Sequence, residues 1–151
     1  MVLSGASGPD QTGLMELRLH RTLKAPAEQV WQALTDASAL TAWFWPERLA
    51  TTAQADPRTG GHYRIASPAA GMAVAGEYRV LDRPHRLCFT WQWDGDPDRT
   101  LVTIDLTPSG DETALNLVHS RFTSDTDRDN HIKGWSDCLD RLPGWLASPA
   151  T

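Results

Sequence analysis

The chain has 151 residues, 40% of them hydrophobic and 22% charged, which is typical of one soluble globular domain that can bury a core of its own. The net charge of -5 argues against a nucleic-acid partner and against attachment to an anionic membrane surface. No apolar run approaches the roughly 18 residues of a membrane-spanning helix.

The N-terminal end, residues 1–13, is rich in Gly and Ser and has neither the basic start nor the apolar segment of a secretory signal. We interpret it as a disordered leader to a single domain over residues 14–147. That domain begins with a strand predicted over residues 14–23, because apolar and polar side chains alternate there.

Two short helices are predicted next. Pro26 suits the first turn of a helix over residues 27–35, whose apolar side chains recur at helical spacing. Residues 35–38, Thr-Asp-Ala-Ser, can end this helix and cap a second, short one that runs through Trp43.

Short alternating runs separated by turn residues fill the middle of the chain. Turn signals such as Asp94-Gly95 suit hairpins, so an antiparallel sheet is predicted. The pair Gly60-Gly61 lacks the helix and lysine of a phosphate-binding loop, and a tight turn with a positive φ explains it better. The six predicted strands are residues 49–55, 61–66, 72–81, 87–93, 100–107 and 113–119.

After Phe122 the spacing of apolar residues becomes helical. Acidic residues between Ser124 and Asp127 suit a helix N-terminus, and the apolar stripe beyond them predicts one long C-terminal helix. Pro143-Gly144 lies inside that stripe and should kink or end the helix. The stripe consists of Ile132, Trp135, Leu139, Leu142 and Leu146.

This order of elements predicts an α+β fold. A curved antiparallel sheet of six or seven strands has one apolar face to cover, and the terminal helix is the element long enough to cover it. The two short helices after the first strand would close one end. A cavity then remains between helix and sheet unless side chains fill it.

Several motifs, taken in this order, resemble a known family. The chain from about Leu14 to Leu146 is similar to the START-like, or SRPBCC, superfamily of helix-grip proteins, and within it to homologues of the activator of the heat-shock protein 90 ATPase. The matching motifs are Ala25-Pro26-Ala27-Glu28-Gln29-Val30-Trp31, Trp43-Phe44, Asp56-Pro57-Arg58-x-Gly60-Gly61-x-Tyr63, Gly76-Glu77-Tyr78, Pro84-x-Arg86-Leu87-x-Phe89-Thr90-Trp91 and Gly134-Trp135.

The resemblance implies a fold, in which the sheet wraps around the C-terminal helix, more specifically than it implies a function. The superfamily holds lipid carriers, hormone receptors, polyketide cyclases and chaperone co-factors, and its small bacterial members consist of one such domain. Since fold does not determine function, the candidate site must be argued from its residues.

The aromatic residues predict an apolar-walled binding site. Seven tryptophans are present, and strand alternation turns several of them inward. Tyr78 and Val80 are expected to share a face, and Trp43 and Phe44 can close the mouth. Because large rings pack poorly against one another in a small domain, a ligand cavity is favoured over a filled core. The candidate binding residues are Trp43, Phe44, Tyr63, Tyr78, Phe89, Trp91, Trp93, His119, Trp135 and Leu139.

Few polar residues accompany these rings. His119 ends a strand on its predicted inward face, where a neutral imidazole could bind a ligand or act as a base, although a buried structural histidine is the commoner case. Glu77 is expected to be solvated and paired with Arg79 or Arg64, and alternation places Asp105 outside the core.

No catalytic residue, metal ligand or cofactor is assigned. The five histidines lack the spacing of HxxxH or HExxH, and no Ser or Cys lies in a nucleophile elbow. Cys88 and Cys138 are too few for a disulfide framework, so two reduced thiols in a cytoplasmic protein are expected.

Three functions remain open. The protein could hold a small hydrophobic or aromatic molecule between its long helix and its sheet. It could be an enzyme similar to polyketide cyclases, with His119 or Tyr63 moving protons. It could be a chaperone co-factor or interaction module, for which Trp45 or Trp145, if exposed, would be the residues to examine as a contact or homodimer patch. The inward aromatic set with few titratable partners favours the first.

Overall fold

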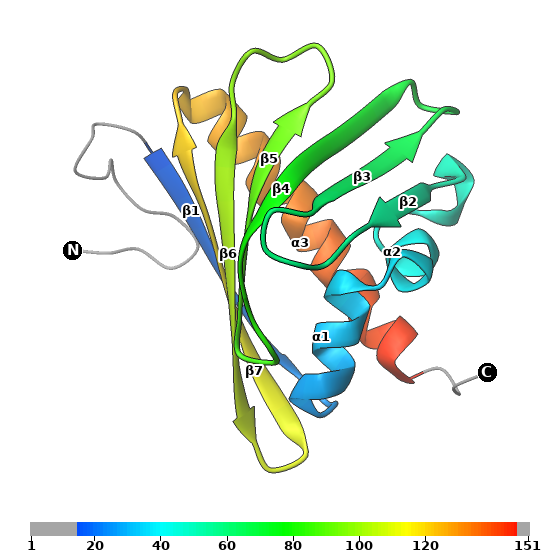
Figure 1. Cartoon of the computed structure of the whole chain (residues 1–151), viewed down its shortest axis with the longest axis vertical. Helices are drawn as coiled ribbons and strands as arrows, with labels where there is room; N and C mark the ends of the chain where they lie inside the picture. Colours follow the sequence, from blue (N-terminus) through cyan, green and yellow to red (C-terminus); the bar gives the residue numbers. More distant parts are fainter. Residues whose placement is uncertain (1–14, 148–151) are drawn as a thin grey trace.

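The computed structural model of the chain describes residues 15–147, and its elements follow the predicted order (Figure 1). The leader predicted over residues 1–13 lies outside the described residues. The helices are α1 (Ala27–Thr35), α2 (Ala37–Trp43) and α3 (Asp125–Ala147), with a 3₁₀ turn, η1 (Glu47–Leu49). The strands are β1 (Met15–Leu23), β2 (Thr52–Ala55), β3 (His62–Ser67), β4 (Met72–Asp82), β5 (Arg86–Trp93), β6 (Thr100–Ser109) and β7 (Glu112–Phe122).

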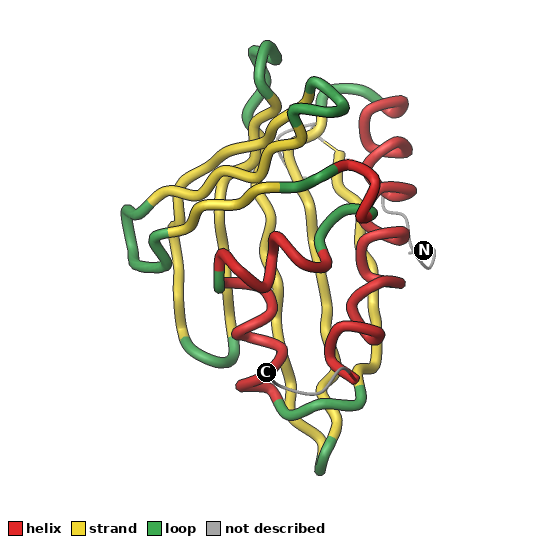
Figure 2. The backbone as a smooth tube through the Cα atoms, turned by 90° about the vertical axis from the view of Figure 1, so that its right-hand side faces the viewer, coloured by secondary structure: helices red, strands yellow, loops and turns green. Residues whose placement is uncertain are grey.

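The strands form one antiparallel sheet in the order β1-β7-β6-β5-β4-β3-β2. Successive hairpins run from β2 to β7, and β7 then pairs with β1, so the first and last strands are neighbours. Figure 2 shows α3 running along the sheet beside the two short helices. The predicted α+β helix-grip fold, with a curved antiparallel sheet and a long C-terminal helix, is confirmed.

The core lies between the inner face of the sheet and the helices. Alternate residues of β6 and β7 point inward, and Val102, Leu115 and Leu117 are completely buried. From α3, Leu139 and Leu142 reach the same core and are equally buried. The alternation of side chains along the strands and the apolar stripe of the helix therefore place the most hydrophobic residues inside.

The helix starts follow the predicted capping chemistry. The Asp36 carboxylate accepts a hydrogen bond from the backbone N–H of Ala39 at 3.0 Å and begins α2. The Ser124 hydroxyl accepts from the N–H of Asp127 at 3.0 Å at the start of α3. Within residues 15–147, no helix is both long and apolar enough to cross a membrane.

Pro143 and Gly144, predicted to kink or end the C-terminal helix, do not end it. α3 continues through Pro143 to Ala147. An internal proline costs about 3 kcal/mol of helix stability because it removes a backbone hydrogen bond. The fully buried Leu142 and the partly buried Trp145 and Leu146 pack against the core on both sides of it, and this burial offsets that loss.

Val80 lies on the opposite face from the one predicted. The pairing of β4 with β5 shifts by one residue between Tyr78 and Val80, which is a β-bulge. Tyr78 is therefore buried while Val80 is 41% exposed. Because side chains alternate with a period of two, one inserted residue moves every later side chain of the strand to the other face.

The largest differences from the predicted element boundaries, three residues each, lie at β2 and β7. Leu49, expected in a strand, belongs to η1, and β2 begins at Thr52. β7 runs three residues past His119, because Arg121 adopts a positive φ of 75° and acts as an extra residue opposite β1. Phe122 consequently turns inward and its ring centroid lies 4.4 Å from that of His119.

Two glycines allow backbone arrangements that other residues would not: a tight turn at position 60 and a close approach of two strands at position 76. Gly60 has the expected positive φ, 85°. At Gly76 a Cβ atom would lie 1.9 Å from the carbonyl oxygen of Thr90 and 2.8 Å from the Tyr63 ring. Strands β4 and β5 can therefore approach this closely because position 76 has no side chain.

We expect Gly76→Ala to lower the free energy of unfolding by about 2 to 3 kcal/mol, because the clash with the Thr90 carbonyl cannot be relieved without moving backbone. Urea denaturation measures the change. Gly134→Ala in α3 is the matched control, because no atom lies within 4 Å of its added Cβ, and it should instead stabilise by about 0.5–1 kcal/mol. Equal unfolding curves for the wild type and Gly76→Ala would contradict this account of the β4–β5 approach.

Candidate functional site

Strand β5 carries the aromatic residues to the inside of the sheet. Phe89 and Trp91 are buried, and Trp93 at the end of the strand is half-buried. Their rings contact one another and their neighbours: the Trp91 centroid lies 5.1 Å from that of Trp135 on α3 and 5.6 Å from that of Trp93. The predicted inward face of β5 thus meets α3 directly.

The space between the sheet and α3 is almost filled. An interior cavity of about 20 Å³ remains there, which is about the volume that one water molecule needs. Its walls are Leu34, Leu40, Phe44, Tyr63, Ile65, Tyr78, Phe89, Trp91, Ile104 and Trp135. Packing of the rings against one another has closed most of the cavity that the sequence predicts.

A larger opening lies on the other side of the same rings. This aromatic groove, of about 260 Å³, runs between α3, the end of β5 and the segment after α2. Trp45 and Trp93 stand parallel in it, with centroids 6.1 Å apart and an interplanar angle of 7°. The groove is lined by Phe44, Trp45, Trp91, Trp93, Asn130, His131, Gly134, Trp135 and Cys138.

The groove brings together four of the ten predicted binding residues, Phe44, Trp91, Trp93 and Trp135. Three others border the interior cavity instead, namely Tyr63, Tyr78 and Phe89. The remaining three are packed in the core: Trp43 donates its indole N–H to the carbonyl of Ala33 at 2.9 Å, and His119 and Leu139 are fully buried.

Sequence reasoning named Trp135 as a binding residue but did not assign the other four residues that α3 contributes to the groove. Asn130, Gly134 and Cys138 are spaced by four residues, and so are His131 and Trp135, which places all five on one side of the helix. The spacing from the predicted Trp135 would have found them. Trp45 and Trp145, considered as exposed contact residues, are both half-buried.

Arg141 holds the segment that forms the edge of the groove. Its guanidinium donates to the backbone carbonyls of Trp43 at 3.3 Å and Phe44 at 2.7 Å. These carbonyls belong to the end of α2, where helix carbonyls lack partners within the helix. α3 thereby fixes the position of Phe44 relative to Trp135, whose centroids lie 5.8 Å apart.

His119 is bonded through both ring nitrogens. The Trp135 indole N–H donates to Nδ1 at 3.0 Å, so Nδ1 carries no hydrogen and Nε2–H donates to the Thr100 hydroxyl at 2.6 Å. Burial lowers the pKa of His119 well below its usual value, and the neighbouring His131 lowers it further. His119 is therefore neutral and has no free nitrogen for a ligand or a proton transfer.

His131 holds the opposite tautomer. The Trp93 indole N–H donates to its Nε2 at 2.9 Å, and its Nδ1–H donates to the backbone carbonyl of Asp127 at 2.7 Å. The centroids of the two imidazoles, His119 and His131, lie 5.1 Å apart. Each imidazole thus accepts one indole N–H and uses its own N–H elsewhere.

Two further ionisable side chains near the rings, Tyr63 and Cys138, stay protonated. Burial raises the pKa of Tyr63 well above its usual value, with a further contribution from Tyr78, and the Tyr63 hydroxyl donates to the Thr90 carbonyl at 2.5 Å. Burial likewise raises the pKa of the Cys138 thiol far above its usual value. Tyr63 and Cys138 therefore supply neither a base nor a nucleophile at neutral pH.

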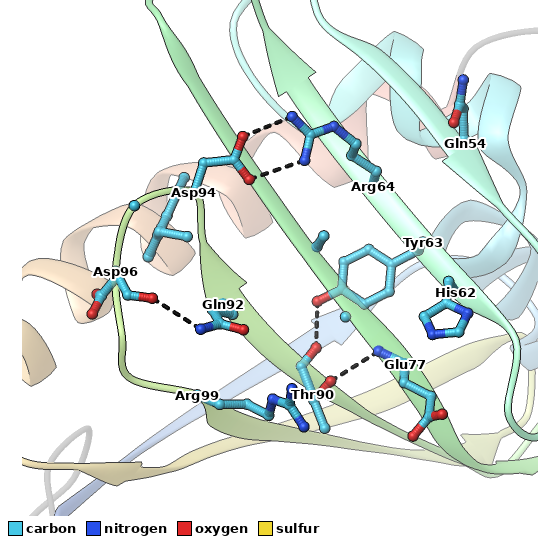
Figure 3. Close-up of a pocket in the computed structure, with 14 residues that line it drawn as sticks. Gln54, His62, Tyr63, Arg64, Glu77, Thr90, Gln92, Asp94, Asp96 and Arg99 are labelled. Carbon is cyan, nitrogen blue, oxygen red and sulfur yellow. Dashed lines mark hydrogen bonds and ion pairs between the residues drawn. The ribbon is translucent and has the colours of Figure 1, made fainter.

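The outer face of the sheet carries a second, polar groove of about 630 Å³ over β2 to β5 (Figure 3). Figure 3 shows Arg64 and Asp94 joined side by side, with N–O distances of 2.9 and 2.7 Å. Glu77 pairs with Arg79 at 2.9 Å, as expected, and Asp105, near this face, pairs with Arg86 at 2.7 Å. A ligand in the polar groove would have to displace water and disturb these ion pairs. A ligand in the aromatic groove would instead move its apolar surface from water to apolar walls, which is favourable.

Comparison with known proteins agrees with the fold. The sequence profile of the family described as "Activator of Hsp90 ATPase homolog 1-like protein" matches residues 24–147. No curated protein matches the chain significantly.

Solved structures with the same fold include protein CV1439 from Chromobacterium violaceum, with a TM-score of 0.77 and 29% identity over 89% of this chain and 98% of that one. CalU16 from Micromonospora echinospora gives 0.73 and 27% over 95% and 83%. The Hsp90 activator PFC0360w from Plasmodium falciparum gives 0.73 and 23% over 89% and 98%, which shows the fold alone.

The buried, neutral His119 predicts a pH dependence of stability. Below about pH 6.5 the histidine of the unfolded chain takes up a proton that the native residue does not, so the unfolded state binds more protons and the free energy of unfolding falls. The slope contributed by this group should approach about 1.4 kcal/mol per pH unit between about pH 6.5 and pH 5.

Urea denaturation of the wild type and of His119→Gln across this range measures that slope. The Gln amide can replace both hydrogen bonds without titrating, so the variant should lose much of the dependence. His62→Gln, at an exposed position of β3, is the control and should keep it. If His119→Gln retained the wild-type slope, the assignment to His119 would be wrong.

Proposed function

This chain belongs to the family of Activator of Hsp90 ATPase homolog 1-like proteins, and from that premise we propose that it binds a flat hydrophobic or aromatic small molecule in the aromatic groove. The observation that carries the proposal is a surface groove of about 260 Å³ that is walled by five aromatic side chains. Concave, mostly apolar openings of this kind are where small molecules usually bind.

The size and composition of the groove favour a compact ligand of two or three fused rings. Ligand pockets usually range from about 300 to 1,000 Å³, so this opening lies just below that range. Removing about 200 Å² of ligand surface from water would contribute roughly 5 kcal/mol before the costs of association. Ring contacts with Trp45 and Trp93, which present parallel faces, would add to this.

The polar groups of the site favour binding over catalysis. His131 at the groove uses both ring nitrogens within the protein, and the Cys138 thiol stays protonated. His119 and Tyr63, the candidates for moving protons in a cyclase-like enzyme, are bonded to Thr100 and to the backbone of residue 90 respectively. A carrier or sensor needs apolar walls and few polar groups, and the groove offers both.

We also propose a cytoplasmic location. Cys88 and Cys138 are both buried and unpaired. Free thiols are ordinary in reducing compartments, where disulfides are rare.

We expect Gly134→Leu to weaken ligand binding at least about tenfold while the protein stays folded, because the new side chain would occupy the groove where position 134 now leaves open space. Equilibrium dialysis with fluorene, a flat three-ring hydrocarbon, measures the dissociation constant. Circular dichroism and urea denaturation report the fold of each variant.

Lys133→Leu is the matched control for this test. It adds the same side chain one residue earlier on α3, at an exposed position that does not line the groove. Its affinity for fluorene should equal that of the wild type. Unchanged binding by a folded Gly134→Leu protein would place the ligand elsewhere and overturn the proposal.

A further inference from the structure

We infer that His131 is a positioning residue of the aromatic groove: only its neutral form holds Trp93 in the wall, so the ligand binds more weakly once His131 takes up a proton. This role rests on the proposed function and adds a regulation of the same site. Its basis is the hydrogen bond of 2.9 Å from the Trp93 indole N–H to Nε2 of His131. Both side chains line the groove, and both are half-buried.

The tautomer of His131 leaves one place for an added proton. Its Nδ1–H donates to the backbone carbonyl of Asp127 at 2.7 Å, so the ring nitrogen without hydrogen is Nε2. That nitrogen is the acceptor for Trp93. In the imidazolium both ring nitrogens are donors, and two N–H groups would face each other across 2.9 Å. Protonation therefore removes the hydrogen bond and drives the indole and the imidazole apart.

Release of Trp93 changes the wall that a flat ligand contacts. The Trp93 ring is parallel to that of Trp45, at an interplanar angle of 7°, and perpendicular to that of Trp91, at 89°. Trp93 is the last residue of β5, and its hydrogen bond to His131 links this outer wall to α3. When the indole turns away, a ligand packed against its face loses that contact.

Acidic residues face His131 from two elements. Asp96 and Asp98, between β5 and β6, and Asp127, one turn earlier on α3, line a small opening of about 20 Å³ together with the imidazole. Two of these carboxylates already accept hydrogen bonds, Asp96 from the N–H of Asp98 and Asp98 from the Thr123 hydroxyl. Acid that reaches the groove therefore meets His131 beside negative charges.

No positive charge opposes a proton on this imidazole. Among the described residues that line the small opening or the groove, none is a lysine or an arginine. Arg128, on the preceding turn of α3, pairs with Asp129 at 3.2 Å. From β7, the buried His119 lies 5.1 Å away between ring centroids and is neutral. The Cys138 thiol of the groove stays protonated.

The sign of the pH dependence follows from which state holds the proton. A ligand packed against Trp93 favours the bonded arrangement, and hence neutral His131, whereas acid favours the imidazolium. The dissociation constant should therefore rise as the pH falls, by at most about tenfold per pH unit for one proton. His119 is neutral in the native protein and affects the measurement only through unfolding, which circular dichroism at each pH reports.

Equilibrium dialysis with fluorene, which has no titratable group, tests this at about pH 7.5 and about pH 5.5, the range in which histidines commonly change charge. We expect the wild type to bind about five- to tenfold more weakly at the lower pH. His131→Gln, whose amide oxygen can accept from Trp93 without titrating, should bind equally at both. His62→Gln, at an exposed position of β3, is the matched control and should keep the wild-type ratio.

Trp93→Phe shows whether His131 acts through the indole. The variant keeps His131 but has no N–H for protonation to displace, so its affinity, although lower, should be the same at both pH values. If its affinity still fell with acid while that of His131→Gln did not, His131 would act on the ligand directly, and its assignment as a positioning residue would be wrong.

A second measurement needs neither ligand nor variant. In ¹H–¹⁵N spectra of the wild type, assigned by triple resonance, the Trp93 indole proton should move upfield as the pH falls, in step with the ring signals of His131. The indole proton of Trp135, bonded to the buried His119, should change little over the same range.

The outcomes separate this inference from the proposed function. If fluorene binds and Gly134→Leu blocks it, but the wild type and His131→Gln show the same ratio between the two pH values, the groove binds ligands and the role of His131 is wrong. A Trp93 indole proton that ignores the titration of His131 is equally contrary to it. If fluorene does not bind to the wild type at either pH, the proposed function fails and the inference fails with it.

Discussion

A single buried imidazole determines how the long helix sits on the sheet. His119 on β7 accepts a hydrogen bond from Trp135 of α3 and donates one to Thr100 of β6, so three elements meet at one side chain. The Thr100 hydroxyl in turn donates to the Trp91 carbonyl of β5 at 3.2 Å. Because each partner has one directional role, the helix cannot rotate or slide without leaving a buried polar group unpaired. Hydrophobic burial attracts α3 to the sheet, and this chain of hydrogen bonds fixes its register.

The same network explains why the site is a groove beside the core rather than a cavity within it. With Trp135 held against the sheet, its ring and those of Trp91 and Phe44 contact one another and leave about 20 Å³ between sheet and helix. The unfilled space is displaced to the outer side of these rings, where α3 presents Gly134. Three rings therefore serve as the wall of the core and the floor of the groove at once.

The sequence predicted the parts of this structure that depend on periodicity. Alternation located the strands, and the stripe from Ile132 to Leu146 located α3, because burial repeats along each element. The errors fall where a single residue breaks the period: the bulge before Val80 and the left-handed Arg121 each reverse the face of the residues after them. Pro143 is a different case, since core packing on both sides outweighs its local preference. For the site, the sequence indicated which rings point inward but not which would contact one another, since ring packing and histidine tautomers depend on contacts distant in the chain.

Two local departures from maximal stability occur at residues that line the groove. Gly134 stands inside a helix with open space around it, where alanine would stabilise by up to about 1 kcal/mol. Trp91 keeps a buried N–H unpaired, because the acceptor nitrogens of both neighbouring imidazoles already accept from other indoles. The indoles of Trp43, Trp93 and Trp135 are all bonded, so the fold supplies acceptors for most of its packed tryptophans. Proteins depart from locally optimal choices chiefly where function requires it. The absent side chain at position 134 is the departure that a ligand would use directly, because it leaves open the space that a ring of the ligand would occupy.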